Sequence, residues 1–248
     1  AGQIDVPDNL SFSRTVTISG STTTSTDDSS SVSSEIPATI PQLTPSIVNR
    51  VSAGKEHTCV IHDDGVACWG NNTFGQTNVP PNITNPIQIV TGRYHSCVLD
   101  DNGVKCWGIT NANYIEDIDV LNPPDLINPR QVSAYAGELN CALDDNGVQC
   151  WGDNSYGQLE VPPLDNPQAI SVGARSACAL DDNGVKCWGR NSSGETDVPS
   201  LVNPTEIKSG WAHHCAKDDR GIICWGFNGN NETDSILDSD WPGKLINF

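Results

Sequence analysis

Ten cysteines stand in five pairs, and within each pair the two cysteines are nine positions apart. Thiols at such a spacing can form a disulfide, stay reduced or bind a metal. Zinc sites use cysteines two to four residues apart, and no cysteine pair here has that spacing, so the pattern favours disulfides over free thiols or a metal site. The predicted bridges join the members of each pair: Cys59–Cys68, Cys97–Cys106, Cys141–Cys150, Cys178–Cys187 and Cys215–Cys224.

Other side chains that could act in catalysis or bind a ligand recur at fixed positions of a repeated unit, and this recurrence favours a structural role for them. His57, His95 and His213 each stand two positions before a first cysteine, where we expect them to form hydrogen bonds within the fold. The Asp-Asn-Gly turns lack the alternating ligands and terminal glutamate of a calcium-binding EF-hand loop. We therefore predict no catalytic residue, no cofactor and no metal site, and expect a protein that is not an enzyme.

Five asparagines lie in Asn-x-Ser/Thr sequons, which permit N-glycosylation but occur about as often as chance allows. They are Asn9, Asn71, Asn82, Asn191 and Asn231.

The cysteine pairs must be positioned by short hairpins, of which CVLDDNGVKCWG at Cys97–Gly108 is the clearest copy. The side chain of the aspartate at the first position of its turn can accept hydrogen bonds from backbone N–H groups. Gly103, at the fourth position, can adopt the positive φ that other residues resist. If Leu99 pairs with Val104, the two cysteines lie opposite each other, at a separation that a disulfide spans. Five copies of this hairpin follow one another, each ending in Trp-Gly.

Each copy reads as three or four short strands: an apolar strand after a proline, the cysteine hairpin, a polar loop and Val-Pro. The first cysteines are 37 to 44 residues apart, and such a period indicates stacked or circularly arranged units. The five tryptophans after the second cysteines are expected to pack between units. The sequence thus predicts an all-β propeller of about five blades over residues 46–248, with one disulfide hairpin in each blade.

Residues 1–45 are predicted to form an N-terminal extended arm. Alternation of Leu10, Phe12, Val16 and Ile18 with serine and threonine predicts a strand at about 10–18 that pairs with a distant partner. Residues 19–45 are rich in Ser, Thr and Pro and read as a linker. Residues 1–7, AGQIDVP, repeat the end of the later units, so either an earlier repeat was removed or this piece completes a unit elsewhere.

The net charge of −18 opposes binding to nucleic acid, and no apolar run is long enough for a membrane span. Ten paired cysteines indicate an oxidising compartment, and Ala1 would suit a position just after signal cleavage. We therefore expect a secreted protein, extracellular or at the cell surface.

The pattern G-x-x-H-(S/T)-C-x-L-x-x-(D/N)-G-V-x-x-W-G-x-N-x-x-G-Q resembles the regulator-of-chromosome-condensation repeat, most clearly at residues 92–108 and 137–158. The short period is similar to that of a bacterial branch that includes a secreted β-lactamase inhibitor. The resemblance implies a β-propeller that acts as a binding platform. A pair of cysteines in each blade, and five repeats where the family usually has seven blades, depart from the family pattern.

Two functional hypotheses follow. In the first, the chain is an extracellular structural or interaction protein, a subunit of a filament or surface assembly whose residues 1–18 complete a blade of the next copy. Closure within one chain is the competing interpretation of the same residues. In the second, a soluble secreted propeller binds a protein or a glycan through the loops of one face.

Overall fold

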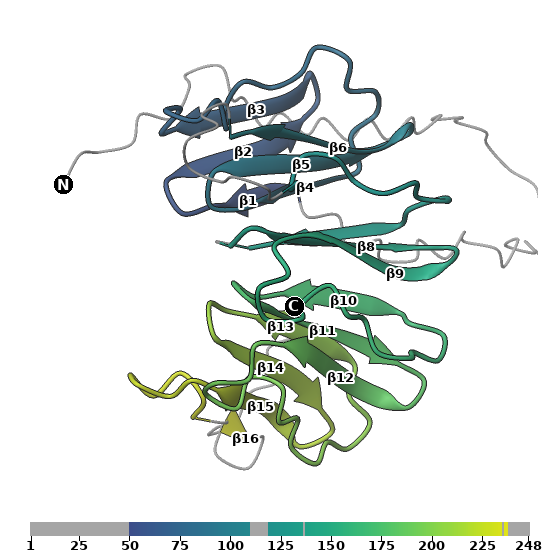
Figure 1. Cartoon of the computed structure of the whole chain (residues 1–248), viewed down its shortest axis with the longest axis vertical. Helices are drawn as coiled ribbons and strands as arrows, with labels where there is room; N and C mark the ends of the chain where they lie inside the picture. The colour runs from purple at the N-terminus through teal and green to yellow at the C-terminus, as the bar shows by residue number, and fades with distance from the viewer. Residues whose placement is uncertain (1–49, 110–118, 136, 235, 238–248) are drawn as a thin grey trace, which may run out of the picture. The chain divides into compact units, whose positions relative to one another are not determined.

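The computed structural model describes residues 50–109, 119–135, 137–234 and 236–237, all of which belong to one compact unit, Asn49–Phe248. This unit contains five antiparallel sheets, each a meander of neighbouring strands (Figure 1). None of the described residues forms a helix long and apolar enough to span a membrane. The predicted strand at 10–18 and linker at 19–45 lie outside the described residues.

The blades contain three strands each, apart from the fifth, which has four. Their strands are β1 (Val51–Ala53), β2 (His57–His62) and β3 (Gly65–Gly70); β4 (Gln88–Thr91), β5 (His95–Asp100) and β6 (Gly103–Gly108); β7 (Gln131–Ala134), β8 (Leu139–Asp144) and β9 (Gly147–Gly152); β10 (Ala169–Val172), β11 (Ser176–Asp181) and β12 (Gly184–Gly189); and β13 (Glu206–Ser209), β14 (His213–Asp218), β15 (Gly221–Gly226) and β16 (Ile236–Leu237). The prediction of an all-β fold with five repeated blades is confirmed.

The hairpin register agrees with the one inferred from the sequence. In the second blade Leu99 pairs with Val104 and Cys97 with Cys106. Because the same register recurs in every blade, each of the five cysteine pairs forms a disulfide inside its own hairpin. Each bridge closes so short a loop that the chain-entropy estimate gives it roughly 2–3 kcal/mol.

A buried aspartate holds the hairpin turn and the incoming loop together. One oxygen of Asp100 accepts the backbone N–H of Asn102, and the other accepts the N–H of Thr84, each at 2.8 Å. Lys105 donates to the same carboxylate at 2.6 Å. Hydrogen bonds from Lys105 and the backbone lower the pKa of Asp100 although burial opposes the shift. Asp144, Asp181 and Asp218 repeat the two backbone contacts.

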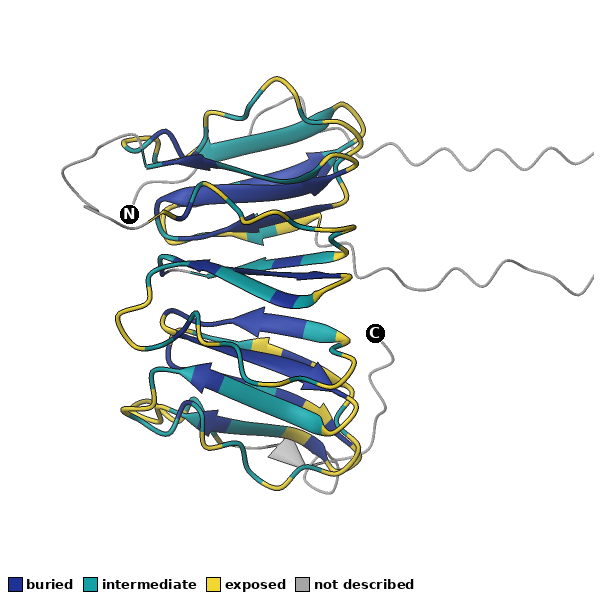
Figure 2. Cartoon of the chain, turned by 45° about the vertical axis from the view of Figure 1, so that its right-hand side comes forward, coloured by how far each residue is buried: buried dark blue, intermediate teal, exposed yellow. Residues whose placement is uncertain are grey.

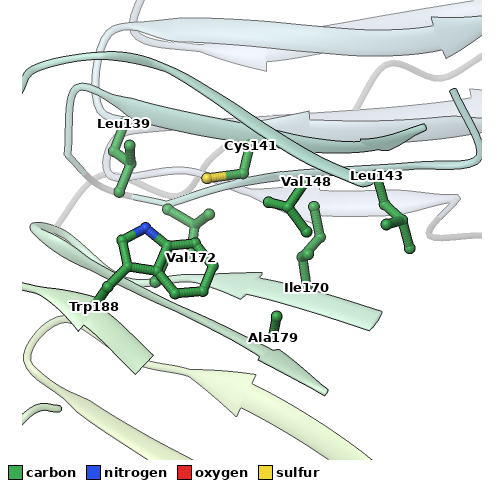
Figure 3. Packing of buried hydrophobic residues seen from close by; sticks show 9 residues of the cluster. Leu139, Cys141, Leu143, Val148, Ile170, Val172, Ala179 and Trp188 are labelled. Atoms are coloured by element: carbon green, nitrogen blue, oxygen red, sulfur yellow. The ribbon is translucent and has the colours of Figure 1, made fainter. Parts of the chain in front are cut away.

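Neighbouring blades pack through apolar side chains and one tryptophan at each interface. Figure 3 shows Leu139 and Leu143 of the third blade facing Ile170 and Trp188 of the fourth, within a single buried cluster. The Trp188 indole N–H donates to the Gln158 carbonyl at 3.0 Å, on the chain that leads out of the third blade. The tryptophans of the second to fifth blades therefore point back toward the preceding blade, as expected for a side chain that fills the gap between blades.

The blades follow one another in chain order, so the first and last sheets lie at opposite ends of this unit (Figure 1). Their outward faces differ in character. Where four blades place a buried isoleucine or leucine on the face toward the next blade, the fifth places the exposed Lys217. Beside Lys217 the same face carries Ile222, which is 38% exposed, and the opposite end of the stack presents Val51, which is 62% exposed.

Candidate functional site

The meander gives the stack two edges with different side chains. The turn edge carries the cysteine hairpin turns. The loop edge carries the turns between the first and second strands and the loops that follow Trp-Gly. Figure 2 shows buried strands inside the stack and exposed segments along these edges. Insertions and sequence differences collect in such loops, so a binding surface is expected at one of the two edges.

The turn edge is acidic, and its carboxylates are engaged in holding the fold. Exposed aspartates of the hairpin turns accept hydrogen bonds from the asparagines that precede the first strand of the same blade, as in Asn128 to Asp145 at 2.7 Å. Arg220 donates to Asp218 at 2.7 Å, and this hydrogen bond lowers the pKa of Asp218 to about 2. A cavity of about 510 Å³ near Asp182 and Pro204 opens on this edge.

The loop edge carries an aromatic cluster on the first two blades. The rings of Phe74 and Tyr94 lie 4.4 Å apart between centroids. The Arg93 guanidinium lies 4.8 Å from the centroid of the Tyr94 ring, in a cation–π arrangement. Arg93 also lies 3.9 Å from Glu138 of the third blade. The cation is thereby fixed between an aromatic face and a carboxylate.

A second cluster surrounds Tyr156, which is 44% exposed at the edge between the third and fourth blades. Arg175 donates to the Tyr156 hydroxyl at 3.2 Å, and its guanidinium lies 5.0 Å from the ring centroid. Arg190 lies 6.0 Å from the same ring and 3.6 Å from the buried Glu195. Two cations therefore hold one exposed aromatic ring in place.

Glu138 lies between these two clusters. Burial raises the pKa of the Glu138 carboxyl, and the nearby Arg93 and Arg175 oppose this shift. Two further aromatic side chains, Trp211 and Phe227, are exposed on the loops of the fifth blade. Tyrosine, tryptophan and arginine are the residues most enriched in the energetic centres of protein interfaces. We call Arg93, Tyr156, Arg175 and Arg190, together with Tyr94, which is buried beneath Arg93, the arginine–aromatic surface.

The sequence analysis missed this surface because it sought repeated residues. Arg93, Tyr94 and Arg175 stand at positions that change from copy to copy inside an otherwise constant frame. The corresponding residues, such as Lys55-Glu56 and Trp211-Ala212, differ in charge and size. The variation at these positions was the signal that could have indicated a binding surface, because most positions that pack the blades together keep the same residue type in every repeat.

The histidines lie between blades rather than at an open site. His57 Nε2 lies 2.9 Å from Ser96 Oγ, and His95 Nε2 lies 2.8 Å from Asn140 Oδ1. His214, to which the sequence pattern gave no role, lies 2.9 Å from Ser176 Oγ. His213 is half-buried on the outward side of the fifth blade. Within the described residues no group of His, Cys, Asp or Glu has the arrangement of a metal site.

The glycosylation sequons remain predictions. Asn82 and Asn231 are exposed. Asn71 and Asn191 are engaged in hydrogen bonds with Glu56 and Asp197. Asn9 and the predicted assembly strand residues Leu10, Phe12, Val16 and Ile18 lie outside the described residues.

A family model of the regulator of chromosome condensation (RCC1) repeat matches residues 48–76, 87–114, 130–158 and 168–195. A search of curated proteins finds no match.

Solved structures with the same fold include plant receptor ectodomains. The chain is 28% identical to the CRINKLY WD40 ectodomain of the Arabidopsis thaliana receptor kinase ACR4 (TM-score 0.55, covering 71% of this chain and 68% of that one). It is 24% identical to the ectodomain of the Physcomitrella patens receptor kinase CR4 (TM-score 0.58, covering 72% and 53%). It is 18% identical to Prp20p of Saccharomyces cerevisiae (TM-score 0.58, covering 71% and 56%). The chain thus spans between about half and two thirds of these relatives.

Proposed function

Because the chain is an RCC1-type repeat β-propeller, we propose that it is a non-enzymatic, extracellular protein-interaction module that binds a protein partner through the arginine–aromatic surface. The observation that carries the proposal is the pair of cation–aromatic clusters on one edge of the stack. At the turn edge, the aspartate carboxylates already accept hydrogen bonds from their own turns and loops. Fewer polar groups there remain available to a partner.

Three of the 13 lysines and arginines of this acidic chain belong to the arginine–aromatic surface. Each of them already has an aromatic or carboxylate neighbour, so the side chains are held in place before a partner arrives. Preorganised arginine and tyrosine lose little conformational freedom on binding, which is why they add affinity efficiently. A partner with carboxylates beside an apolar patch matches this chemistry.

The extracellular part of the proposal rests on a disulfide in every blade, which an oxidising compartment would maintain. The likeness to two receptor-kinase ectodomains supports the same location. Solved structures of other RCC1-type propellers include yeast Prp20 bound to the protein Kap60. A protein partner is therefore favoured over a glycan, although the loop edge offers aromatic rings to either.

Site-specific photocrosslinking in the native surroundings tests the proposal. A photoreactive phenylalanine analogue at position 156 places the probe on the arginine–aromatic surface, and the same residue at position 146 places it on an exposed turn at the other edge. We expect a discrete crosslinked protein from position 156 only, and a loss of affinity of at least about tenfold on Arg175→Ala. Equal crosslinking from both positions, or none from position 156, would refute the proposal.

Assembly into a filament through residues 1–18 stays a prediction, as do the glycans and the relation to the bacterial branch. The mass of the full chain in solution, measured with and without residues 1–18, decides the first of these. A monomer at all concentrations in both forms argues against a filament.

A further inference from the structure

One backbone hydrogen bond recurs at the loop edge of every blade and places two residues directly opposite each other. In the fourth blade the Arg190 N–H donates to the Arg175 carbonyl at 2.9 Å, one step beyond the paired residues Ser176 and Gly189. Residues opposed in this way have neighbouring side chains. Among these described pairs, only that of the fourth blade consists of two cations. The pairs are Glu56 with Asn71, Tyr94 with Ile109, Glu138 with Asp153, Arg175 with Arg190, and Ala212 with Phe227.

The third blade places two acids opposite each other, and both are satisfied within the chain. Asp153 accepts the backbone N–H of Ser155 at 3.0 Å and the side-chain amide of Gln158 at 2.8 Å. Glu138 lies 3.9 Å from Arg93. Each acid therefore has hydrogen-bond donors or a cation of its own.

The two cations of the fourth blade, which we call the paired arginines, are satisfied unequally. Arg190 lies 3.6 Å from Glu195, which is 1% exposed. Arg175 is exposed and donates to the Tyr156 hydroxyl at 3.2 Å. Within the part of the chain that the structure describes, Arg175 forms no ion pair, and the nearby Glu138 forms its ion pair with another arginine. The two guanidiniums around the Tyr156 ring therefore carry one uncompensated positive charge.

Stability alone does not favour this arrangement in an acidic chain. Like charges at opposed positions repel each other and lower stability. The chain has only 13 lysines and arginines against 31 acids, and it places two of these cations at adjacent positions. A local rule that is broken without compensation inside the fold is characteristic of a functional site. An anion bound between the two guanidiniums removes the repulsion.

Aromatic residues flank the paired arginines on both sides. The Ala174 N–H donates to the Trp211 carbonyl at 3.0 Å, so Trp211 belongs to the loop of the fifth blade that lies next to Arg175. The Trp211 side chain is 54% exposed. On the other side, the exposed Tyr156 stands in the loop that follows the third blade. Apolar contact area is thus available beside the uncompensated charge.

We propose that the paired arginines bind a single carboxylate of the partner protein, supplied by an aspartate or glutamate side chain, over the Tyr156 ring. Guanidinium groups bind a carboxylate through parallel N–H···O hydrogen bonds, and one negative charge balances the one uncompensated positive charge. An apolar side chain next to that acid covers Trp211. Arg93 takes no part, because Glu138 already holds it. This inference rests on the proposed function and adds to it the position and charge of the group that the partner contributes.

NMR of the arginine Nε–Hε groups in the isotope-labelled full chain tests the proposal. Replacing each arginine in turn by lysine assigns the resonances. The probes are the capped dipeptides acetyl-Leu-Glu-amide and acetyl-Leu-Gln-amide, which differ in charge and hardly in size. We expect the glutamate probe to shift Arg175 and Arg190 together and to saturate at millimolar concentration, as is usual for so small a ligand. The glutamine probe should bind at least about tenfold more weakly.

Two variants separate a binding role from a structural one. Glu195→Gln removes the charge that neutralises Arg190, and Gln158 makes the same turn contact at the equivalent position of the preceding repeat. We expect this variant to bind the glutamate probe at least about threefold more tightly. Arg175→Gln should abolish binding, whereas Arg130→Gln, which removes a half-exposed arginine of the turn edge, should leave the affinity unchanged.

The proposal fails if the glutamate probe leaves the paired arginines unshifted, if it shifts every arginine equally, or if Glu195→Gln weakens its binding. It also fails if glucuronate binds the paired arginines more tightly than the glutamate probe, because the anion would then belong to a glycan.

The crosslink from position 156 keeps this test distinct from that of the proposed function. A crosslinked protein without a response of the paired arginines refutes the carboxylate subsite and leaves the function standing. A response of the paired arginines without a crosslinked protein supports the subsite and refutes the function.

Discussion

The buried pair formed by His95 and Asn140 offers a direct test of how neighbouring blades recognise each other. Both side chains are inaccessible to solvent, and His95 Nε2 lies 2.8 Å from Asn140 Oδ1. The equivalent pair at the next interface is apolar, because Leu139 and Ala177 stand at the same two positions and lie in one buried cluster. Equivalent positions at two blade interfaces are therefore occupied by a polar pair in one case and an apolar pair in the other.

Replacing one member of the pair should cost more than replacing both. His95→Leu leaves the Asn140 oxygen buried without its strongest partner, which is expected to lower the free energy of unfolding by about 1–3 kcal/mol. Asn140→Ala does the same to the His95 ring. The double variant His95→Leu/Asn140→Ala recreates the pair found at Leu139 and Ala177, so we expect it to recover about 1–2 kcal/mol relative to the sum of the single changes.

Urea denaturation with the disulfides intact, followed by tryptophan fluorescence, measures this coupling through a double-mutant cycle. Leu139→Ala is the control for simple loss of volume, since it removes apolar contacts without leaving a polar group unpaired. If the two single changes add without coupling, the blades do not recognise each other through this pair, and the reasoning fails.

Three further predictions concern pH, the hairpin turn and the turn glycine. Burial lowers the pKa of His95 and of His214 to about 4, so the fold favours neutral rings; the thermal midpoint should be constant above pH 6.5 and fall between pH 6.5 and 4, less so in His95→Leu/Asn140→Ala. Asp181→Ala removes an acceptor of two backbone N–H groups and should cost about 1–3 kcal/mol in urea denaturation, whereas Asp182→Ala, on the exposed neighbour, should cost less than about 1 kcal/mol; equal costs would contradict the role of the buried carboxylate. Gly103 has a φ of 107° and open space around it, so Gly103→Ala should lower stability by about 1 kcal/mol or more through backbone strain alone, and an unchanged midpoint would show that the turn adapts.

Much of the architecture follows from local rules that the sequence displays. The aspartate-to-glycine turn sets the register, and the register places Cys97 opposite Cys106, so the hairpins and bridges could be predicted together. The repeat period then implied stacked blades. The positions of the tryptophans between blades followed from their size and their recurrence.

Contacts between different repeats of the chain could not be predicted in the same way. The pairing of Ser176 with His214 depends on how two blades meet, and no spacing along one copy contains that information. Arg175 and Tyr156 are 19 residues apart in two different loops, and they come together only because the third and fourth blades stack. A surface built from residues that differ between repeats is hidden from a search for what repeats share.

Peptide mapping of the unreduced protein tests the central structural claim most directly, because stapled hairpins that stack in chain order require each bridge to stay inside its own copy. The account predicts five linked peptide pairs, each joining cysteines nine residues apart, and no free thiol in the described chain. Disulfides between cysteines of different repeats, or unlinked cysteines in the native protein, would contradict it.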